Sequence, residues 1–324
     1  MPRIIRIATI AMGGQGGPTV ADNRRLLAGL IEQGLAEKPD ILAIPESFTL
    51  ARLAEAHIEE MAEDVPGPTL EMVSKYARDH HSYILCPILA RRLDGLYIEA
   101  FLLDRSGQIA GSYQKHHPVV EGSAYTQVEF GSRPGRDLPI FDTDFGRIGV
   151  QICFDVEYQD GWEALDKAGA EIIFWLSAYD GGRSVSSKAW TYHRFVASAV
   201  QGTRARIVDI MGETLAITGK HDLIAACNID LETTLFHMDF NLTQVQAIRA
   251  KYGPDVTMHL YHEENYFTLQ SNRADLPVSQ ITKEFQLEPL KEYIQRNQRL
   301  QDALRSGGPL PDLTPPYAGR IQYI

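Results

Sequence analysis

The feature that most constrains the fold is a short apolar strand that ends at a cysteine. Ile148, Val150 and Ile152 alternate with smaller or polar residues and predict a buried strand, and Cys153 follows directly. In α/β folds the turn after such a strand exposes reacting groups, because the sheet holds its base rigid. Taken alone, Cys153 is more simply explained as a small buried core residue, as most free cysteines are. The rest of the chain changes that balance.

The chain begins with a pattern typical of a β-α-β unit. Residues 4–11 form an apolar run that predicts a strand, and Thr19 or Asp22 can cap a helix that runs to about Glu37. A second strand is expected at residues 41–44. Because such a unit joins parallel strands, the sheet is expected to begin with parallel pairing.

Later segments extend this α/β pattern. Residues 97–103 and 108–113 predict a hairpin, which would make the sheet mixed. The other expected strands are 83–89, 139–141, 148–152, 170–176, 207–211 and 223–230, and the other expected helices are 51–64, 67–80, 162–168, 188–202 and 283–305. The pattern changes after Asp230, so we expect one domain at residues 1–230 and a C-terminal extension at residues 231–324, either solvated or in contact with a second subunit.

Three polar residues that are remote in sequence each follow an apolar strand: Glu46, Lys115 and Cys153. A nearby cation lowers the pKa of a thiol, so we expect a thiolate at Cys153. A carboxylate can take a proton and later activate water, and an ammonium group with a backbone N–H can hold the oxygen of a tetrahedral intermediate. Together these groups supply the parts of a covalent acyl transfer. Taken singly, the glutamate is explained as a solvated loop residue.

Composition excludes several classes of protein. The 324 residues carry a formal net charge of -11, which argues against nucleic-acid binding and against adhesion to anionic membranes. No apolar run approaches the length of a membrane span, and no signal-peptide pattern precedes the first strand. The cysteines Cys86, Cys153 and Cys227 form neither a disulfide framework nor a CxxC metal site, so we expect a reducing cytoplasm.

Three segments resemble the signature segments of the nitrilase, or carbon–nitrogen hydrolase, superfamily. They are Pro45-Glu46-Ser47, Tyr113-Gln114-Lys115 and residues 149–155, in the matching order and in the same strand-end context. The resemblance covers roughly residues 4–230, including Leu176-Ser177-Ala178. It implies a four-layer α-β-β-α sandwich, an oligomer built from two-fold contacts, and hydrolysis of non-peptide C–N bonds with no metal and no cofactor.

The resemblance also implies roles for individual residues. Cys153 would be the nucleophile, Glu46 the general base, and Lys115 the oxyanion-stabilising group, with the backbone N–H of Phe154 as second donor. The family often has a second glutamate after the lysine. Glu121 fits best, because a Lys-x-x-Pro spacing followed by Glu-Gly is similar to the aliphatic amidases, and Glu129 is the competitor.

Two departures from the family pattern bear on function. True nitrilases usually carry Cys-Trp-Glu, whereas Cys153-Phe154-Asp155 is closer to the amidase and carbamoylase branches. The Arg-Ala-x-Glu-Asn run that the family places near residues 194–202 is absent, which weakens any inference about the packing behind the site.

Other candidate residues have less support. Tyr179, Trp190 and His116 are expected to line the substrate site, although the two larger aromatic residues fit core positions equally well. His259 and His262 stand beside two glutamates, but their spacing matches no strong metal motif, so we expect no metal ion.

Three functions follow from these observations. The first is a thiol-dependent amidase that acts on a small amide, and the second is a nitrilase that uses the same residues through a thioimidate. The third is a catalytically silent scaffold in which Cys153 is a buried core thiol and the C-terminal extension binds a partner. The resemblance favours an enzyme that is a homodimer or a higher homo-oligomer.

Overall fold

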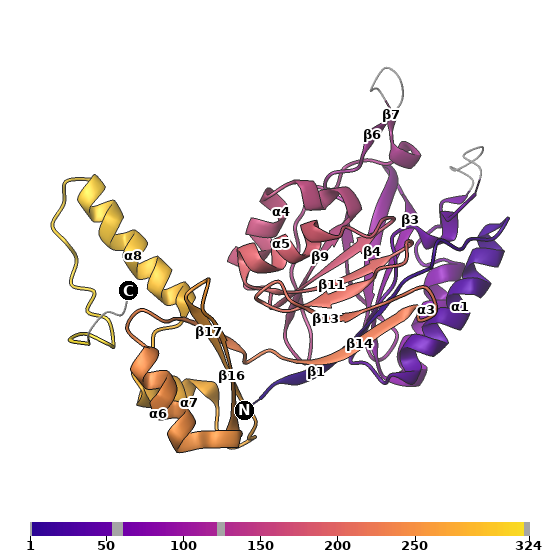
Figure 1. Cartoon of the computed structure of the whole chain (residues 1–324). Helices are drawn as coiled ribbons and strands as arrows, with labels where there is room; N and C mark the ends of the chain where they lie inside the picture. The colour runs from indigo at the N-terminus through magenta and orange to yellow at the C-terminus, as the bar shows by residue number, and fades with distance from the viewer. Residues whose placement is uncertain (1, 54–60, 122–126, 321–324) are drawn as a thin grey trace. The chain divides into compact units, whose positions relative to one another are not determined.

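The computed structural model describes residues 2–53, 61–121 and 127–320 (Figure 1). It divides the chain into two compact units. The larger comprises Ile5–Ile229, and the smaller comprises Asp230–Ile324 together with the residues up to Ile4. Each unit is described by itself.

The first sheet of the larger unit is mixed, with strand order β14-β1-β2-β3-β4-β5. β2 pairs in parallel with β1 and β3, whereas β3, β4 and β5 form the antiparallel meander whose second hairpin the sequence predicts. The strands are β1 (Ile4–Ile10), β2 (Ile41–Ala43), β3 (Tyr83–Arg92), β4 (Gly95–Leu103), β5 (Ile109–Gln114) and β14 (Ile224–Asp230). The predicted β-α-β start and the mixed sheet are confirmed.

The second sheet has the order β13-β12-β11-β10-β9-β8. Its central strands β9, β10 and β11 run parallel, and β8, β12 and β13 are added in antiparallel fashion at its two sides. The strands are β8 (Phe141–Asp142), β9 (Arg147–Ile152), β10 (Ile172–Ser177), β11 (Phe195–Val200), β12 (Arg206–Val208) and β13 (Thr214–Ile217). A short ribbon of β6 (Val120–Glu121) and β7 (Gln127–Val128) lies outside both sheets.

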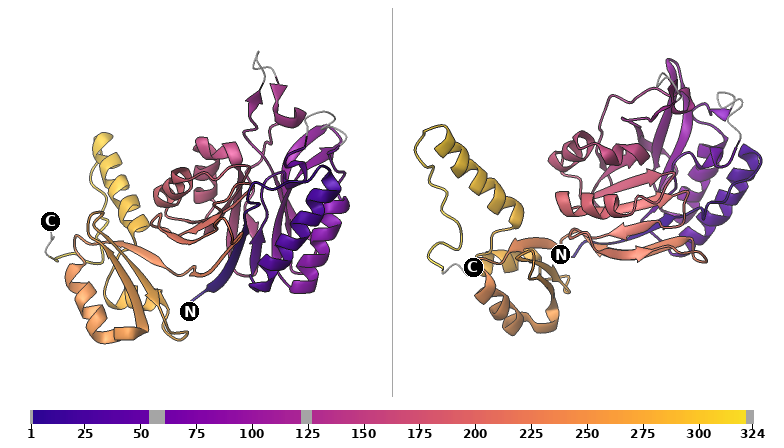
Figure 2. Two further views of the ribbon diagram at one scale, coloured as in Figure 1. Left: turned by 45° about the vertical axis from the view of Figure 1, so that its right-hand side comes forward. Right: turned by 45° about the horizontal axis from the view of Figure 1, so that its top comes forward.

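Helices cover the outer face of each sheet (Figures 1 and 2). α1 (Val20–Ala36) and α3 (Pro68–His80) pack on the first sheet, and α4 (Asp160–Lys167) and α5 (Arg183–Tyr192) pack on the second. Thr19 caps α1 by accepting a hydrogen bond from the backbone N–H of Asp22. The predicted four-layer α-β-β-α sandwich is confirmed.

Strands at the centre of the sandwich are buried on both faces, because helices lie on one side and the other sheet on the other. In β10, Ile173 and Trp175 pack with the α4 and α5 side chains, and the alternate residues Ile172 and Phe174 are also fully buried. A rigid double layer of this kind fixes the strand ends, where the polar residues of the sequence pattern lie.

The helix predicted for residues 188–202 is wrong in its second half. α5 ends at Tyr192, His193 adopts the left-handed conformation with φ 48°, and residues Phe195–Val200 form strand β11. β11 pairs in parallel with β10 and is buried throughout. A short apolar run has no period that separates a buried strand from a buried helix, which explains the error.

The C-terminal unit is folded around its own core and is more than a solvated extension. An antiparallel sheet of order β15-β17-β16 packs with three helices, and the rings of Phe236 and Phe267 stack 5.1 Å apart in its core. The helix predicted at 283–305 is interrupted, because one helix ends at Glu284 and the next begins at Leu290. The elements are β15 (Thr234–His237), β16 (Val256–Tyr261), β17 (Tyr266–Ser271), α6 (Leu242–Tyr252), α7 (Val278–Glu284) and α8 (Leu290–Arg305).

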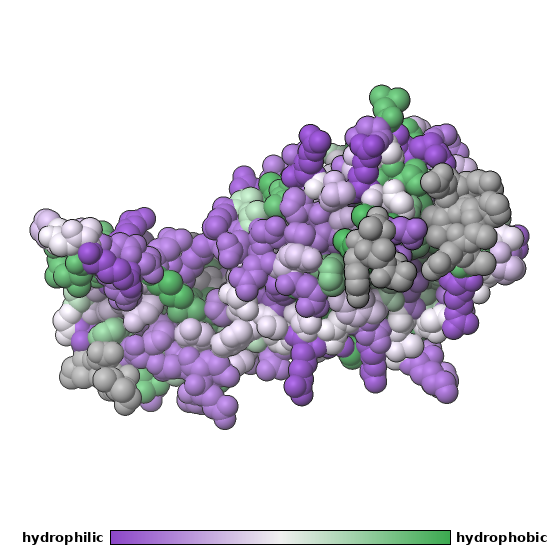
Figure 3. Space-filling model, turned by 90° about the horizontal axis from the view of Figure 1, so that it is seen from above, coloured by the Kyte–Doolittle hydropathy of each residue, from purple (hydrophilic) through white to green (hydrophobic). Residues whose placement is uncertain are grey.

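Four short 3₁₀ turns complete the described structure: η1 (Phe48–Leu50), η2 (Glu129–Gly131), η3 (Cys153–Glu157) and η4 (Gly253–Asp255). The helix expected at residues 51–64 falls largely on 54–60, which lie outside the described residues. On the face shown in Figure 3, hydrophilic side chains predominate and apolar ones form small scattered groups. Within the described ranges, no helix has the length and apolarity that a bilayer crossing requires.

Candidate active site

The two sheets bring the three predicted residues to one place. Glu46 follows β2 and Lys115 follows β5 in the first sheet, and Cys153 follows β9 in the second. The Nζ atom of Lys115 lies 2.8 Å from Oε1 of Glu46, and the charges of both residues act on the thiol of Cys153. Less than a tenth of each of the three residues is exposed. The rule that polar residues after buried strands converge therefore holds here.

Glu46 is held by groups from the neighbouring strand ends. Its Oε2 atom accepts a hydrogen bond of 3.1 Å from the backbone N–H of Ala178, at the end of β10. Its main-chain oxygen accepts one of 2.7 Å from Nε2 of Gln201, at the end of β11. One carboxylate oxygen thus faces Lys115 and the other faces a backbone donor, which fixes the orientation of the group. Ala178 could have been found by the strand-end rule, whereas the incorrect helix at 188–202 concealed Gln201.

The second glutamate beside Lys115 is Glu129 and not Glu121. Oε1 of Glu129 contacts Nζ of Lys115 and accepts a hydrogen bond of 3.1 Å from the backbone N–H of Val119. Glu121 is exposed and lies in β6, where it pairs with Gln127 of β7. The preference for Glu121 rested on a spacing that resembles the aliphatic amidases, whereas the contact with the lysine is made by Glu129, which directly follows β7.

Burial and the two carboxylates set the charges in the site. Burial alone would lower the pKa of Lys115, but Glu46 and Glu129 outweigh it and the pKa of Lys115 is raised, so it is a cation. Burial raises the pKa of Glu129, with Lys115 opposing that shift. A cation held between two acids is thereby kept charged in a site from which water is largely excluded.

The expected thiolate at Cys153 is wrong. Burial, followed by the charge of Glu46, raises the pKa of Cys153 to about 12, although Lys115 and hydrogen bonds from Ser177 and Ala178 act in the opposite direction. The cysteine is therefore a neutral thiol at neutral pH. A neutral thiol can act as a nucleophile when a base takes its proton, and Glu46 is a carboxylate whose charge acts on this thiol.

Asp155 fixes the turn that carries the cysteine. Cys153 has φ 47°, in the left-handed region, and its main-chain oxygen accepts a hydrogen bond of 2.8 Å from the Trp175 indole. The buried carboxylate of Asp155 accepts hydrogen bonds from the backbone N–H of Ile152 at 2.8 Å and from the hydroxyl of Tyr113 at 2.7 Å. It therefore ties the end of β9 to the end of β5. In the sequence, the only signal of this role is an acid two residues after the cysteine.

Phe154 and Tyr179 are two further predicted site residues. Phe154 lies in the first turn of η3, where backbone N–H groups have no partner within the turn, as the predicted oxyanion donor requires. Tyr179 packs edge-on against Trp175, with ring centroids 5.2 Å apart, and its pKa is raised to about 12, first by burial and then by its electrostatic interaction with Cys153.

Trp190 and His116 are the other two residues predicted to line the substrate site. Trp190 is on α5, where its ring meets that of His193 with centroids 5.5 Å apart. The imidazole of His116 is directed toward Asp160 at the start of α4. These contacts do not test the predicted role of either residue in the substrate site, which stays a prediction.

Within the described ranges, the only group with the composition and spacing of metal ligands is His116, His117 and Asp160. His259 and His262 are not part of this group.

Comparison with known proteins agrees with this geometry. The family model described as carbon-nitrogen hydrolase matches residues 6–250. Omega-amidase NIT2 of Xenopus tropicalis is 23% identical over 236 residues, which cover 66% of this chain and 85% of the relative. Beta-ureidopropionase of Arabidopsis thaliana is 30% identical over 207 residues, which cover 58% of this chain and 48% of the relative.

Solved structures share the fold. Nit3 of Saccharomyces cerevisiae, described as a member of branch 10 of the nitrilase superfamily, aligns with a TM-score of 0.61 at 17% identity and covers 78% of this chain and 95% of its own. An amidase of Nesterenkonia sp. aligns with a TM-score of 0.59 at 18% identity, covering 70% and 90%. A family match over most of the sequence, the α-β-β-α fold and the convergent strand ends agree: this chain belongs to the carbon–nitrogen hydrolase family.

Proposed function

We propose that this protein hydrolyses the C–N bond of a small amide through a thioester on Cys153, releasing ammonia or an amine and a carboxylic acid. The observation that carries the proposal is the buried pair of Glu46 and Lys115, 2.8 Å apart, whose charges act on the cysteine. Amidases among the relatives and structural neighbours support an amide, rather than a nitrile, as the substrate.

In the first half of the reaction, Glu46 takes the proton of Cys153 as the sulfur attacks the carbonyl carbon. A base is needed because the thiol is neutral at neutral pH. The C–S bond forms and the carbonyl electron pair moves onto oxygen. Nζ of Lys115 and the backbone N–H of Phe154 stabilise that oxygen, as preorganised donors do in a site with little water.

The intermediate then collapses and water completes the reaction. The C–N bond breaks, and protonated Glu46 gives its proton to the leaving nitrogen. Glu46 next removes a proton from a water molecule that attacks the thioester carbonyl. The C–S bond breaks, Cys153 regains a proton from Glu46, and the carboxylic acid leaves. Glu46 can serve in both halves of the reaction because it is again an unprotonated carboxylate at the end of each half.

Glu129 has a different task in this scheme. It contacts Lys115 and is also fixed by the backbone N–H of Val119. We assign it as a positioning residue, which holds the ammonium group where the oxyanion forms. Tyr179, near the thiol but 42% exposed, is assigned to the entrance of the substrate site.

The proposal also covers the oligomeric state and the cellular location of the protein. The chain is proposed to assemble as a homodimer or a higher homo-oligomer, which sedimentation analysis of the purified protein would measure. A cytoplasmic location is proposed because all three cysteines are free thiols. Fractionation of cells that express the native chain would test it.

The proposed activity is tested by ammonia release from a panel of short primary amides, with and without a terminal carboxylate, an N-carbamoyl amino acid, and the matched nitriles. Wild type is compared with Cys153→Ala, and hydroxylamine is added to trap an acyl-enzyme as the hydroxamate. We expect amide turnover and hydroxamate formation in wild type only. Faster release from nitriles would replace the proposal by a nitrilase, and no release above the Cys153→Ala level from the whole panel would support the silent scaffold.

A further inference from the structure

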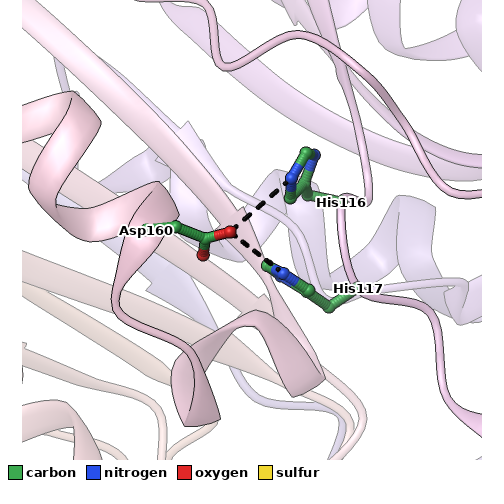
Figure 4. Close-up of side chains that lie close together, drawn as sticks. All are labelled: His116, His117 and Asp160. Carbon is green, nitrogen blue, oxygen red and sulfur yellow. Dashed lines mark ion pairs between the residues drawn. The ribbon is translucent and has the colours of Figure 1, made fainter.

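A second cluster of titratable residues lies next to the catalytic lysine. His116 and His117 directly follow Lys115, and Asp160 is the first residue of α4 (Figure 4). Oδ2 of Asp160 lies 3.7 Å from Nε2 of His116 and 3.3 Å from Nε2 of His117. These three atoms lie within 4.8 Å of one another. None of the three side chains has a part in the hydrolysis proposed above.

The partners of His117 determine which of its nitrogens carries the proton. Nδ1 lies 3.1 Å from Oδ1 of Asp155, a buried carboxylate that also accepts bonds from Tyr113 and Ile152. An ionised acid accepts hydrogen bonds, so the proton of a neutral His117 is assigned to Nδ1. The lone pair of Nε2 then faces the carboxylate oxygen of Asp160 at 3.3 Å. In the ion-free protein a proton between these two atoms is enough, because the hydrogen bond to Asp155 raises the pKa of His117; a metal ion would take the place of that proton.

His116 is also suited to bind an ion. Its Nδ1 atom is buried and has no hydrogen-bond partner among the described residues, and its Nε2 atom lies beyond hydrogen-bond distance from Asp160. The Oδ1 atom of Asp160 accepts a hydrogen bond from the backbone N–H of Gly161, which leaves Oδ2 directed toward the two imidazoles. The dashed lines in Figure 4 show both imidazoles meeting this single oxygen.

We propose that His116, His117 and Asp160 form a binding site for a divalent cation of the zinc class. Bonds from zinc to nitrogen or carboxylate oxygen are about 2.0–2.2 Å long, so two ligand atoms of a tetrahedral site lie about 3.4 Å apart. The separations of 3.3 and 3.7 Å match that value. Two imidazoles with one carboxylate favour zinc or a similar transition metal over calcium or magnesium, which prefer oxygen ligands.

The surroundings of the cluster agree with a metal site. The bond from His117 Nδ1 to Asp155 is the outer contact that metal-bound histidines usually make to a carboxylate. The side chain of Asp160 is 53% exposed, so an ion can enter from solvent and water can supply the fourth ligand. The proposal departs from the sequence analysis, which expected no metal and gave His116 to the substrate site.

Bound metal would connect two segments that carry active-site residues. His116 and His117 belong to the loop after β5 with Lys115, and Asp160 follows η3, which begins at Cys153. An ion at this cluster would therefore restrain both segments at once, and stabilise the fold by its preferential binding to the native state. The site is proposed as structural or regulatory and takes no part in bond breaking.

The test is a titration of full-length protein with Zn²⁺ by calorimetry, and with Co²⁺ by visible absorption. All variants carry Cys153→Ala, which removes the nucleophilic thiol as a competing ligand. We expect one ion per chain, with the absorption of tetrahedral Co²⁺. Binding should weaken at least tenfold in Asp160→Asn and in His117→Ala. Asp160→Asn keeps an oxygen for the start of α4, and circular dichroism would verify the fold of each variant.

His259→Ala is the matched control, because His259 is an exposed histidine on β16, outside the cluster. It should bind one ion as tightly as its parent. Unchanged affinity in either cluster variant, loss of binding in His259→Ala, or no stoichiometric binding at 100-fold excess of ion would each overturn the proposal. All of these outcomes are independent of whether the wild-type enzyme hydrolyses an amide.

Discussion

Two clusters of charged and titratable side chains meet on one loop and differ in burial. The inner cluster holds Glu46, Lys115 and Glu129, whose side chains are 3%, 1% and 10% exposed. The outer cluster holds His116, His117 and Asp160, whose side chains are 25%, 17% and 53% exposed. Lys115 and His116 are neighbours in sequence, yet one enters the sandwich and the other faces the start of α4.

The difference shows how burial assigns different chemistry to adjacent residues. In the inner cluster, water cannot replace a lost partner, so each charge depends on its neighbours and the geometry is fixed. In the outer cluster, water reaches Asp160, so a proton or an ion can enter and leave. Asp155 connects the two clusters. It accepts a hydrogen bond from the hydroxyl of Tyr113, which precedes Lys115 in the chain, and it contacts the imidazole of His117.

The largest effect is expected from Lys115→Met, which keeps the volume of the side chain and removes its charge. Glu46 and Glu129 would then share the inner cluster without a cation. We expect the free energy of unfolding to fall by about 3–5 kcal/mol. Amide turnover should fall about 10³-fold or more, because the oxyanion loses a charged donor. Urea unfolding and ammonia release measure the two effects.

Lys167→Met is the control for this experiment. Lys167 forms an exposed pair with Glu163 on α4, at 3.3 Å, with side chains 76% and 47% exposed. Its removal should cost about 0–0.5 kcal/mol. If Lys115→Met and Lys167→Met had the same free energy of unfolding, burial would not explain why the inner cluster differs from exposed charge pairs.

The second effect concerns the choice of glutamate. Glu129→Gln keeps the shape of the side chain but weakens its hold on Lys115, so we expect kcat to fall about 10²-fold with little change in KM. Glu121→Gln should change kcat less than twofold, because Glu121 is exposed in β6. Steady-state kinetics of both variants would decide. An equal loss in Glu121→Gln would restore the preference that the sequence spacing suggested.

The third effect tests the connection between the clusters. Asp155→Asn keeps an oxygen acceptor but removes the charge that meets His117, so both clusters should lose order. We expect kcat to fall about tenfold, with KM unchanged, and the Zn²⁺ affinity of the Cys153→Ala background to fall about tenfold as well. Kinetics and calorimetry give the two values. A loss of activity with unchanged metal affinity would confine Asp155 to the inner cluster.

Most of the fold follows from the sequence pattern. Strands such as residues 148–152 and 83–89 were predicted because they combine apolar side chains with clear breaks at their ends. The failures have physical causes. Residues 195–200 form a strand because β10 offers them a parallel partner, and a partner remote in sequence leaves no local signal. The strands of the C-terminal unit were missed because they are half polar and alternate weakly.

The site was predictable to the extent that it follows strand ends. Each of its three central residues stands just after the end of an apolar strand: Glu46, Lys115 and Cys153. The sandwich brings these strand ends together. Glu129 was not distinguished from Glu121, because the pairing of β6 with β7 and the contact of Glu129 with Lys115 leave no signal in the local sequence. The neutral state of Cys153 was also missed. The sequence predicts a nearby cation, but only the structure shows the burial that outweighs it.

The smallest effect concerns the protonation of Cys153. Because its pKa is raised to about 12 in the folded protein, against about 8.5 in an unfolded chain, the thiolate fraction should rise with pH throughout the range in which the fold is stable. Iodoacetamide labelling at Cys153, measured by peptide mass spectrometry, should therefore accelerate about tenfold per pH unit from pH 7 to 9, where a small reference thiol levels off. The same raised pKa lowers stability above pH about 8.5, since only the unfolded thiol then loses its proton. Labelling that levelled off below pH 8 would mean that Lys115 lowers the pKa of Cys153 more than burial raises it. Cys153 would then be a thiolate beside the inner cluster and would need no base for attack.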